Sequence, residues 1–335
     1  MKLKLFTGIT LAVALTAGLW LKFHHQPQPV EKSVSELVKP DINSLPKLVP
    51  INVPRMVTIA ARPSEVQPPA LALPVSGWSA VQKIGDMRAS YEERLKAIRS
   101  LPDHLTDTDW EVLKPFLLKP DGVDRAQLGQ VIKNELLDKL CAMNPPLDGL
   151  GDVLTQMYRD QQQNEVIRDY AVQHLTAYYE QMATQPDSAK TGQAVQDVLW
   201  EAVNETSDSI GGTALLALKR LAQEYSGIDQ EKIAATALKM ANDSNAGELS
   251  HITAFQVCAQ MGTADALPVV LSAAQNGETI SVQMSAIGAM GSLGGPDQIP
   301  FLNDVLAGSE DRLKPAAQHA LEQISNRKNQ LASQK

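Results

Sequence analysis

The chain has 335 residues, of which 44% are hydrophobic and only 4% are aromatic, so a large core would consist mainly of small and aliphatic side chains. This composition favours closely packed helices over a β-sandwich. Charge is uneven: residues 1–88 hold ten Lys and Arg against five Asp and Glu, whereas residues 89–335 hold twenty against thirty-three. A body this acidic repels phosphate backbones, which argues against nucleic-acid binding.

The N-terminus has the pattern of an export signal. Two lysines precede residues 5–21, which carry no charge, and Lys22 follows them. Seventeen helical residues span roughly 26 Å, slightly less than the ~30 Å hydrocarbon core of a bilayer. Because no clean A-x-A cleavage site follows, we expect residues 1–25 to be a retained signal anchor, with a cleaved signal peptide as the alternative. The body would then be anchored at the inner membrane outside the cytoplasm, or be secreted or periplasmic after cleavage.

A proline-rich stretch follows the apolar segment. Residues 26–75 contain ten of the twenty prolines of the chain, and helices cannot run through that density. We therefore predict an extended, semi-rigid linker over residues 26–76. It could be a spacer that lifts the body off the membrane, or a leader with no spacing role.

The remainder of the chain repeats itself. Residues 253–268 align without a gap with residues 285–300, at an offset of 32 positions, and fainter copies occur at offsets of 31, 40 and 43. Periods of this length indicate a helical solenoid with two helices in each unit. The positions shared by the clearest pair of repeats are Gly262 and Gly294, Asp265 and Asp297, and Pro268 and Pro300.

These shared positions resemble HEAT repeats, and in particular the short bacterial HEAT-like repeats of the phycobilin-lyase type. The resemblance implies an all-α, armadillo-like, right-handed α-solenoid of about six helix pairs over residues 77–325. An unpaired last helix at 313–325 and a polar tail at 326–335 would follow. The motif expects Val or Ile and then Arg at the start of the first helix of a pair; Ile167-Arg168 fits this expectation, whereas Val282-Gln283 departs from it.

Four glycines fall within residues 284–302. Gly294, like Gly262, is expected to end a helix in the left-handed conformation. Gly288 and Gly291 lie inside the predicted helix, where each costs about 1 kcal/mol relative to Ala, and close approach of a neighbouring helix would compensate for that cost. Further upstream, Thr108 to Glu111 has the pattern of a capping box.

The sequence does not provide the residue patterns of the common enzyme classes. It has no Gly-Lys dipeptide, as a Walker A motif requires, and no His-Glu pair, which iron hydroxylases built on HEAT repeats use. Cys141 and Cys258 lie 117 positions apart and fit two small buried hydrophobes. We therefore expect no enzymatic activity, no cofactor, and neither catalytic nor metal-binding residues.

A concentration of tyrosine and arginine offers a candidate protein-binding site, because both residues are favoured in binding hot spots. Tyr170, His174 and Tyr178 are spaced to share one helix face. The full candidate set is Arg159, Arg168, Tyr170, His174, Tyr178 and Tyr179. The alternative is that this stripe packs between repeats.

The function expected from the sequence is an exported scaffold that binds another protein. Solenoids present extended surfaces that suit protein partners. Two alternatives stay open: a small-molecule-binding or lyase-like HEAT-repeat enzyme that uses the concave face, and a structural spacer of the cell envelope.

Overall fold

The computed structural model describes residues 77–120, 126–183, 185 and 188–333. The predicted signal segment at 1–25 and the proline-rich linker at 26–76 lie outside these residues. The chain divides into two units at residue 68, and the description below concerns the second unit. Within the described ranges, no helix combines the length and the apolar content needed to cross a bilayer.

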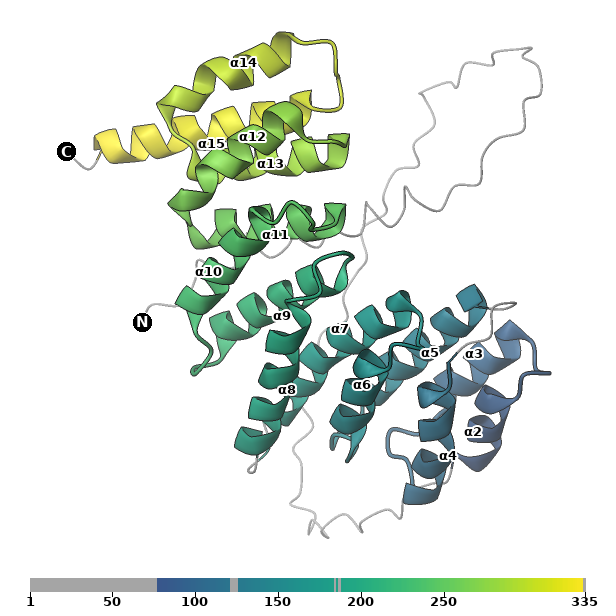
Figure 1. The fold of residues 1–335 in the computed structure, drawn as a ribbon. Coiled ribbons are helices and arrows are strands. Elements are labelled where there is room, and N and C mark those ends of the chain that lie inside the picture. The colour runs from purple at the N-terminus through teal and green to yellow at the C-terminus, as the bar shows by residue number, and fades with distance from the viewer. Residues whose placement is uncertain (1–76, 121–125, 184, 186–187, 334–335) are drawn as a thin grey trace, which may run out of the picture. The chain divides into compact units, whose positions relative to one another are not determined.

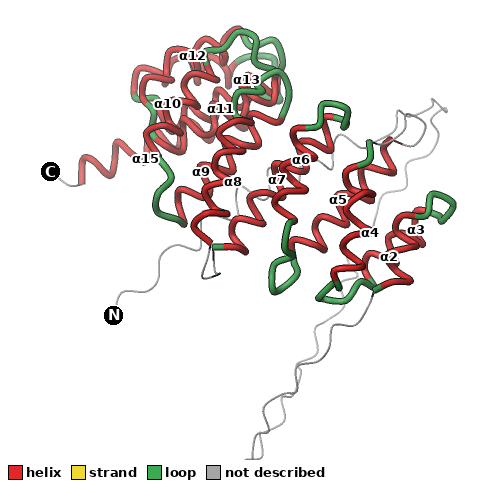
Figure 2. Tube along the Cα trace, turned by 60° about the horizontal axis from the view of Figure 1, so that its bottom comes forward, coloured by secondary structure: helices red, strands yellow, loops and turns green. Residues whose placement is uncertain are grey.

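The described part of the chain is built of α-helices joined by short loops, and it contains no strand (Figure 2). Two short 3-10 turns, at Ala264–Ala266 and Pro296–Gln298, precede α12 and α14. The fourteen α-helices are α2 (Trp78–Gly85), α3 (Tyr91–Arg99), α4 (Asp107–Leu118), α5 (Ala126–Cys141), α6 (Leu150–Arg159), α7 (Glu165–Met182), α8 (Ser188–Ala202), α9 (Ile210–Glu224), α10 (Gln230–Ala241), α11 (Glu248–Met261), α12 (Leu267–Asn276), α13 (Ile280–Leu293), α14 (Ile299–Ala307) and α15 (Lys314–Ser333).

The helices stack in chain order as a helical solenoid (Figure 1). Each odd-numbered helix from α3 to α13 packs against the next odd-numbered helix, and α2, α4, α6 and α8 pack in the same way along a second row. Across the rows, α3 packs against α2, α7 against α6, α11 against α10, α13 against α12 and α15 against α14. The prediction of an unpaired last helix is therefore wrong, because α14 is the partner of α15. The last helix differs from the prediction: α15 packs against both α13 and α14 and continues to Ser333, so residues 326–333 are helical rather than a tail.

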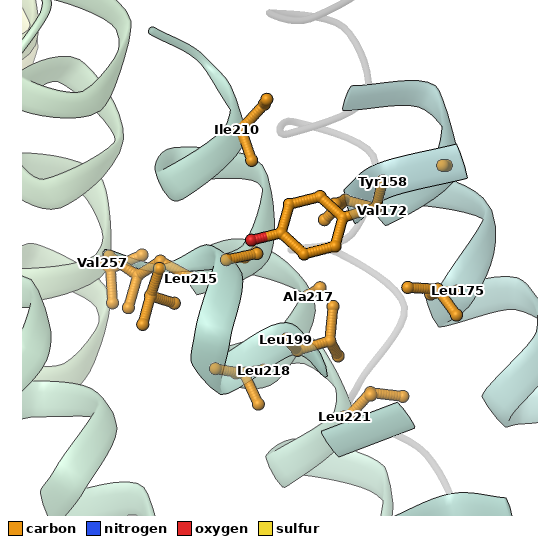
Figure 3. Packing of buried hydrophobic residues seen from close by; sticks show 14 of the residues in the cluster. Tyr158, Val172, Leu175, Leu199, Ile210, Leu215, Ala217, Leu218, Leu221 and Val257 are labelled. Carbon is orange, nitrogen blue, oxygen red and sulfur yellow. The ribbon is translucent and has the colours of Figure 1, made fainter. Parts of the chain in front are cut away.

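The core lies between successive helices. Buried side chains of α7, α8, α9 and α11 converge there (Figure 3). Leu175, Leu199, Leu218 and Leu221 are each fully buried in this cluster. Burying a leucine contributes about 1.5 to 3 kcal/mol, so no helix pair can be stable without the neighbours that cover its apolar face.

A recurring hydrogen bond joins odd-numbered helices to the end of the helix before them. The fourth residue of the helix reaches back to a carbonyl group at that end: Arg94 Nε donates to Ile84 O at 2.8 Å, and Arg168 Nε donates to Tyr158 O at 2.7 Å. Such donors satisfy carbonyl groups that a helix terminus leaves without a partner, and a cation also complements the helix dipole.

The fourth residue of the odd-numbered helices is also a hydrogen-bond donor in the later repeats. In α11, His251 Nε2 lies 2.9 Å from Asp243 O, and in α13, Gln283 Nε2 donates to Gly277 O at 2.9 Å. Gln283 therefore makes the inter-helix bond at the place where the repeat motif would put an arginine. The departure from the repeat motif at Val282-Gln283 therefore replaces the arginine donor with a glutamine and retains the hydrogen bond to the preceding helix end.

The turn glycines differ in their backbone geometry. Gly262 ends α11 with φ +68°, in the left-handed region, as predicted. The prediction for Gly294 is wrong, because φ −77° and ψ 172° make it extended. A Cβ atom at Gly294 would lie 2.7 Å from Met290 O, so close backbone packing is what excludes a side chain there.

The two glycines inside α13 also differ. A Cβ atom on Gly291 would lie 2.8 Å from the Cα atom of Ala320 in α15, which confirms the expected close approach of a neighbouring helix. The same expectation is wrong for Gly288, because no atom lies within 4 Å of a Cβ atom built there. Only one of these two glycines is therefore needed for helix packing.

The remaining shared positions form the helix starts. Asp265 and Asp297 lie in the two 3-10 turns, and Pro268 and Pro300 occupy the first turns of α12 and α14. Proline is tolerated there because the first turn leaves its N–H groups without helical partners anyway.

The capping box of α4 lies two residues before its predicted place. The hydroxyl group of Thr106 accepts from Asp109 N, and the Asp109 carboxylate accepts from Thr106 N, so α4 begins at Asp107. Thr108 and Glu111 lie inside the helix.

Candidate functional site

The structure places most of the predicted protein-binding residues in the core. Arg168, His174, Tyr178 and Tyr179 are only 5%, 7%, 5% and 8% exposed, and Tyr170 is half-buried. A partner cannot reach the buried four without opening the helix stack. The stripe therefore packs between repeats, which was the alternative interpretation of this pattern.

Arg168 joins two helices and a loop. Its Nη2 atom donates to both carboxylate oxygens of Glu205, at 2.8 and 2.6 Å, while its Nε atom bonds the end of α6. The Tyr158 hydroxyl group donates to the same carboxylate at 2.6 Å. Burial and the adjacent carboxylate raise the pKa of Tyr158, so the phenol stays protonated. The network is a structural clamp between α6, α7 and the loop after α8.

The other buried members of the set also have structural partners. His174 Nε2 lies 3.0 Å from Asn134 Oδ1 of α5, and burial lowers the pKa of His174 to about 4. The Tyr178 ring covers Gly151, where a Cβ atom would lie 2.5 Å from the ring. The Tyr179 ring meets Tyr225 edge-on at 5.2 Å.

Arg159 is the exposed member of the set. Its guanidinium group pairs with Glu201, with Nη2 2.6 Å from Oε2. The arginine side chain is 53% exposed and that of Glu201 is 45% exposed, so solvent screens this pair.

Both cysteines are free thiols. Burial raises the pKa of Cys141 to about 12 and that of Cys258 to about 11, so both are protonated at neutral pH. A thiol rather than a thiolate is a poor nucleophile. Within the described ranges, no three His, Cys, Asp or Glu residues gather as metal ligands would.

A pocket that the sequence did not suggest lies between α8 and α10. Its volume is about 270 Å³. Pockets that enclose small-molecule ligands typically measure roughly 300 to 1,000 Å³, so this one suits a protein side chain better than a chromophore. The lining residues are Trp200, Val203, Asn204, Thr206, Lys232, Thr236, Lys239, Met240 and Asp243.

The pocket combines an aromatic wall with two ammonium groups. Lys232 Nζ lies 3.9 Å from the centre of the Trp200 ring, as a cation–π contact. Lys239 follows seven positions later in α10, and both lysines are exposed. Among the described residues, neither ammonium group has an ion-pair partner. Since the surrounding body is acidic, this is a local concentration of available positive charge.

The polar atoms at the back of the pocket are already engaged. The Thr206 hydroxyl group donates to Asp243 Oδ2 at 3.0 Å, and Asn245 N donates to Asp243 Oδ1 at 3.0 Å. These hydrogen bonds lower the pKa of Asp243, which is therefore ionised. Thr236 Oγ1 donates to Lys232 O at 2.7 Å. The ammonium groups of Lys232 and Lys239, by contrast, make no hydrogen bond to the described residues.

This pocket could not be anticipated from the sequence. Trp200 is one of four tryptophans in the chain, and the two lysines lie 32 and 39 positions beyond it, with no motif that connects them. Only the packing of α8 beside α10 brings these side chains together.

The architecture defines a helical-repeat protein, and the comparisons identify the repeats in its C-terminal part. Residues 238–322 match the model of HEAT repeats. A solved structure of human deoxyhypusine hydroxylase in complex with glycerol is 16% identical, with a TM-score of 0.31, over 75% of this chain and 96% of that chain. A likeness this weak carries no conclusion about activity. No curated protein matches the chain significantly.

Proposed function

We propose that this protein is an exported, right-handed HEAT-repeat scaffold that binds another protein and that residues 5–21 hold it at the membrane. The repeat match and the helix stack support a binding role, because stacked helices present long surfaces to protein partners. The basic start and the uncharged segment after it support export. The proposal assigns binding and no catalytic step to the chain.

One observation carries the binding role. Large apolar side chains are exposed on three successive odd-numbered helices that pack side by side: Leu216 of α9 is 37% exposed, Leu249 of α11 is 36% exposed, and Met284 of α13 is 39% exposed. Single exposed apolar residues are common on any protein surface, but a series along neighbouring helices offers several anchors to one partner.

Site-specific crosslinking in cells tests the binding role. A photoreactive amino acid would be placed at position 216, 249 or 284 in turn, with position 112 of α4 as the control, since Val112 is equally exposed at 37% but lies on the even-numbered row. We expect the three test positions to capture the same protein and the control to capture none of it. Absence of adducts at all three test positions, or equal capture at position 112, would contradict the proposal.

Export and anchoring need a separate test. In cells that make the full chain with a C-terminal tag, protease added to spheroplasts should remove the tag, and the protein should resist alkaline extraction from membranes. A protected tag would refute export. An accessible tag on a protein that is released by alkaline treatment would instead indicate a cleaved signal.

A further inference from the structure

We propose that the pocket between α8 and α10 binds the carboxylate side chains of an acidic segment of the partner protein. This inference rests on the proposed function and adds the chemistry by which the partner is recognised. The binding groups are the ammonium groups of Lys232 and Lys239, and Trp200 forms the wall against which the bound segment lies.

The positive charge of the two lysines favours an acidic segment as the ligand of the pocket. The described residues provide no ion pair for Lys232 or Lys239, although residues 89–335 hold thirty-three acidic residues against twenty basic ones. An acidic segment brought to the two lysines therefore gains two ion pairs, one at each ammonium group, without breaking an existing one. The acidic body also disfavours nucleic acid, whose extended phosphate backbone would be repelled outside the pocket.

The contact with Trp200 prepares one of these lysines for binding. A lysine side chain loses up to about 2 kcal/mol of conformational entropy when it is fixed, and a cation–π contact offsets part of that loss before a ligand arrives. Because its Nζ atom lies 3.9 Å from the ring centre, Lys232 loses less conformational entropy upon binding than a free surface lysine does.

The fixed carboxylate of Asp243 directs the ligand. Its two oxygens accept from Thr206 and Asn245, and among the described residues it forms no ion pair with either lysine. Because it is ionised, it repels an incoming carboxylate from its end of the pocket. An acidic side chain therefore binds on the side of the two ammonium groups.

The separation of the lysines predicts the spacing of acidic residues in the partner. Seven helical residues correspond to about 10 Å along α10. A segment in the polyproline II conformation rises about 3.1 Å per residue with three residues per turn, so acidic side chains three positions apart lie on one face and match this distance. The volume of about 270 Å³ leaves room between them for a residue that contacts Trp200 and Met240.

Selection from a phage-displayed random dodecapeptide library tests the inference. The baits would be the full-length wild-type chain in detergent, the K232Q/K239Q variant, and the K190Q/K328Q variant as a charge-matched control at exposed lysines outside the pocket. A K232R/K239R variant tests whether positive charge is sufficient. Circular dichroism would verify that every bait is folded.

We expect wild type, the control and the arginine variant to enrich peptides with Asp or Glu three positions apart. The best such peptide, measured by fluorescence anisotropy, should bind K232Q/K239Q about tenfold more weakly, which corresponds to two partly screened ion pairs. Peptide pools that are equally acidic for wild type and K232Q/K239Q would overturn the pocket assignment and leave protein binding intact. Recovery of no peptide above the bare support would count against the proposed function itself.

Discussion

Replacing Gly288 with alanine should stabilise the protein, whereas the same change at Gly291 should destabilise it. Both glycines lie inside α13, three positions apart, so the intrinsic helix preference gained is the same, about 0.5 to 1 kcal/mol each. The two substitutions differ in what the new methyl group meets, and the difference in their effects therefore measures packing alone.

The expected change in stability depends on the atoms that each new methyl group meets. At Gly288 the methyl group meets no atom within 4 Å, so the full gain of up to about 1 kcal/mol is expected. At Gly291 it would lie 2.8 Å from Ala320 Cα and 2.5 Å from Gln323 Oε1. Gln323 can move, but the backbone of α15 cannot move without separating two packed helices. Overpacking of this kind costs about 1 to 3 kcal/mol, which exceeds the gain in helix preference and leaves a net loss of up to about 2.5 kcal/mol.

Hydrogen exchange of the α13 amides is the suitable assay, because stacked repeats can open locally and do not guarantee a two-state transition. Protection should rise about fivefold in Gly288→Ala and fall in Gly291→Ala. Thermal unfolding should shift by about 2 °C upward for Gly288→Ala. Loss of protection in Gly288→Ala, or a gain in Gly291→Ala, would refute the packing described between α13 and α15.

Two further predictions concern buried charges. Arg168→Ala should lower the free energy of unfolding in urea by about 2 to 3 kcal/mol, because it leaves Glu205 without the guanidinium group that bonds both of its oxygens. Arg159→Ala breaks the exposed pair with Glu201 and should lower it by less than about 1 kcal/mol. Equal losses in the two variants would contradict the clamp. The folded-state pKa of His174, about 4, lies below the ordinary histidine value of 6.5, so the contribution of neutral His174 to stability is complete above pH 6.5 and falls as the pH decreases toward 4. Between pH 7 and pH 4.5 the wild type should lose about 2 to 3 kcal/mol more than His174→Gln, and parallel curves for the two proteins would show that His174 is not buried in its neutral form.

The arrangement of helices could be predicted from the sequence because the repeat is a pattern of spacing. An apolar face that no single pair can bury forces stacking, and positions such as Pro268 and Pro300 mark the same point in successive units. The end of the stack was less predictable, since residues 326–333 are polar. The helix continues there in part because Arg327 bonds Gly291 O and Gly294 O of α13, which is a contact between distant positions.

The site was harder to predict because composition does not reveal which way a side chain points. Tyr178 and Arg168 have the residue types of a binding hot spot, but they lie on the helix faces that meet the neighbouring repeats. Conversely, nothing in the sequence distinguishes Lys232 and Lys239 from other surface lysines. Their importance depends on the position of Trp200 beside Lys232 in the folded chain. Local sequence patterns predict helices and caps. Which side chains are exposed together on one surface depends instead on which helices become neighbours.

The bonds made by the fourth residue of α3, α7, α11 and α13 also bear on how the chain is assembled in time. Each bond joins residues separated by only 6 to 10 positions, and each points back toward the N-terminus. A helix can therefore be secured to its predecessor as soon as it emerges from a ribosome or a translocation channel, before any later repeat exists. Such a chain can fold progressively during its synthesis, with each new unit templated by the one already in place.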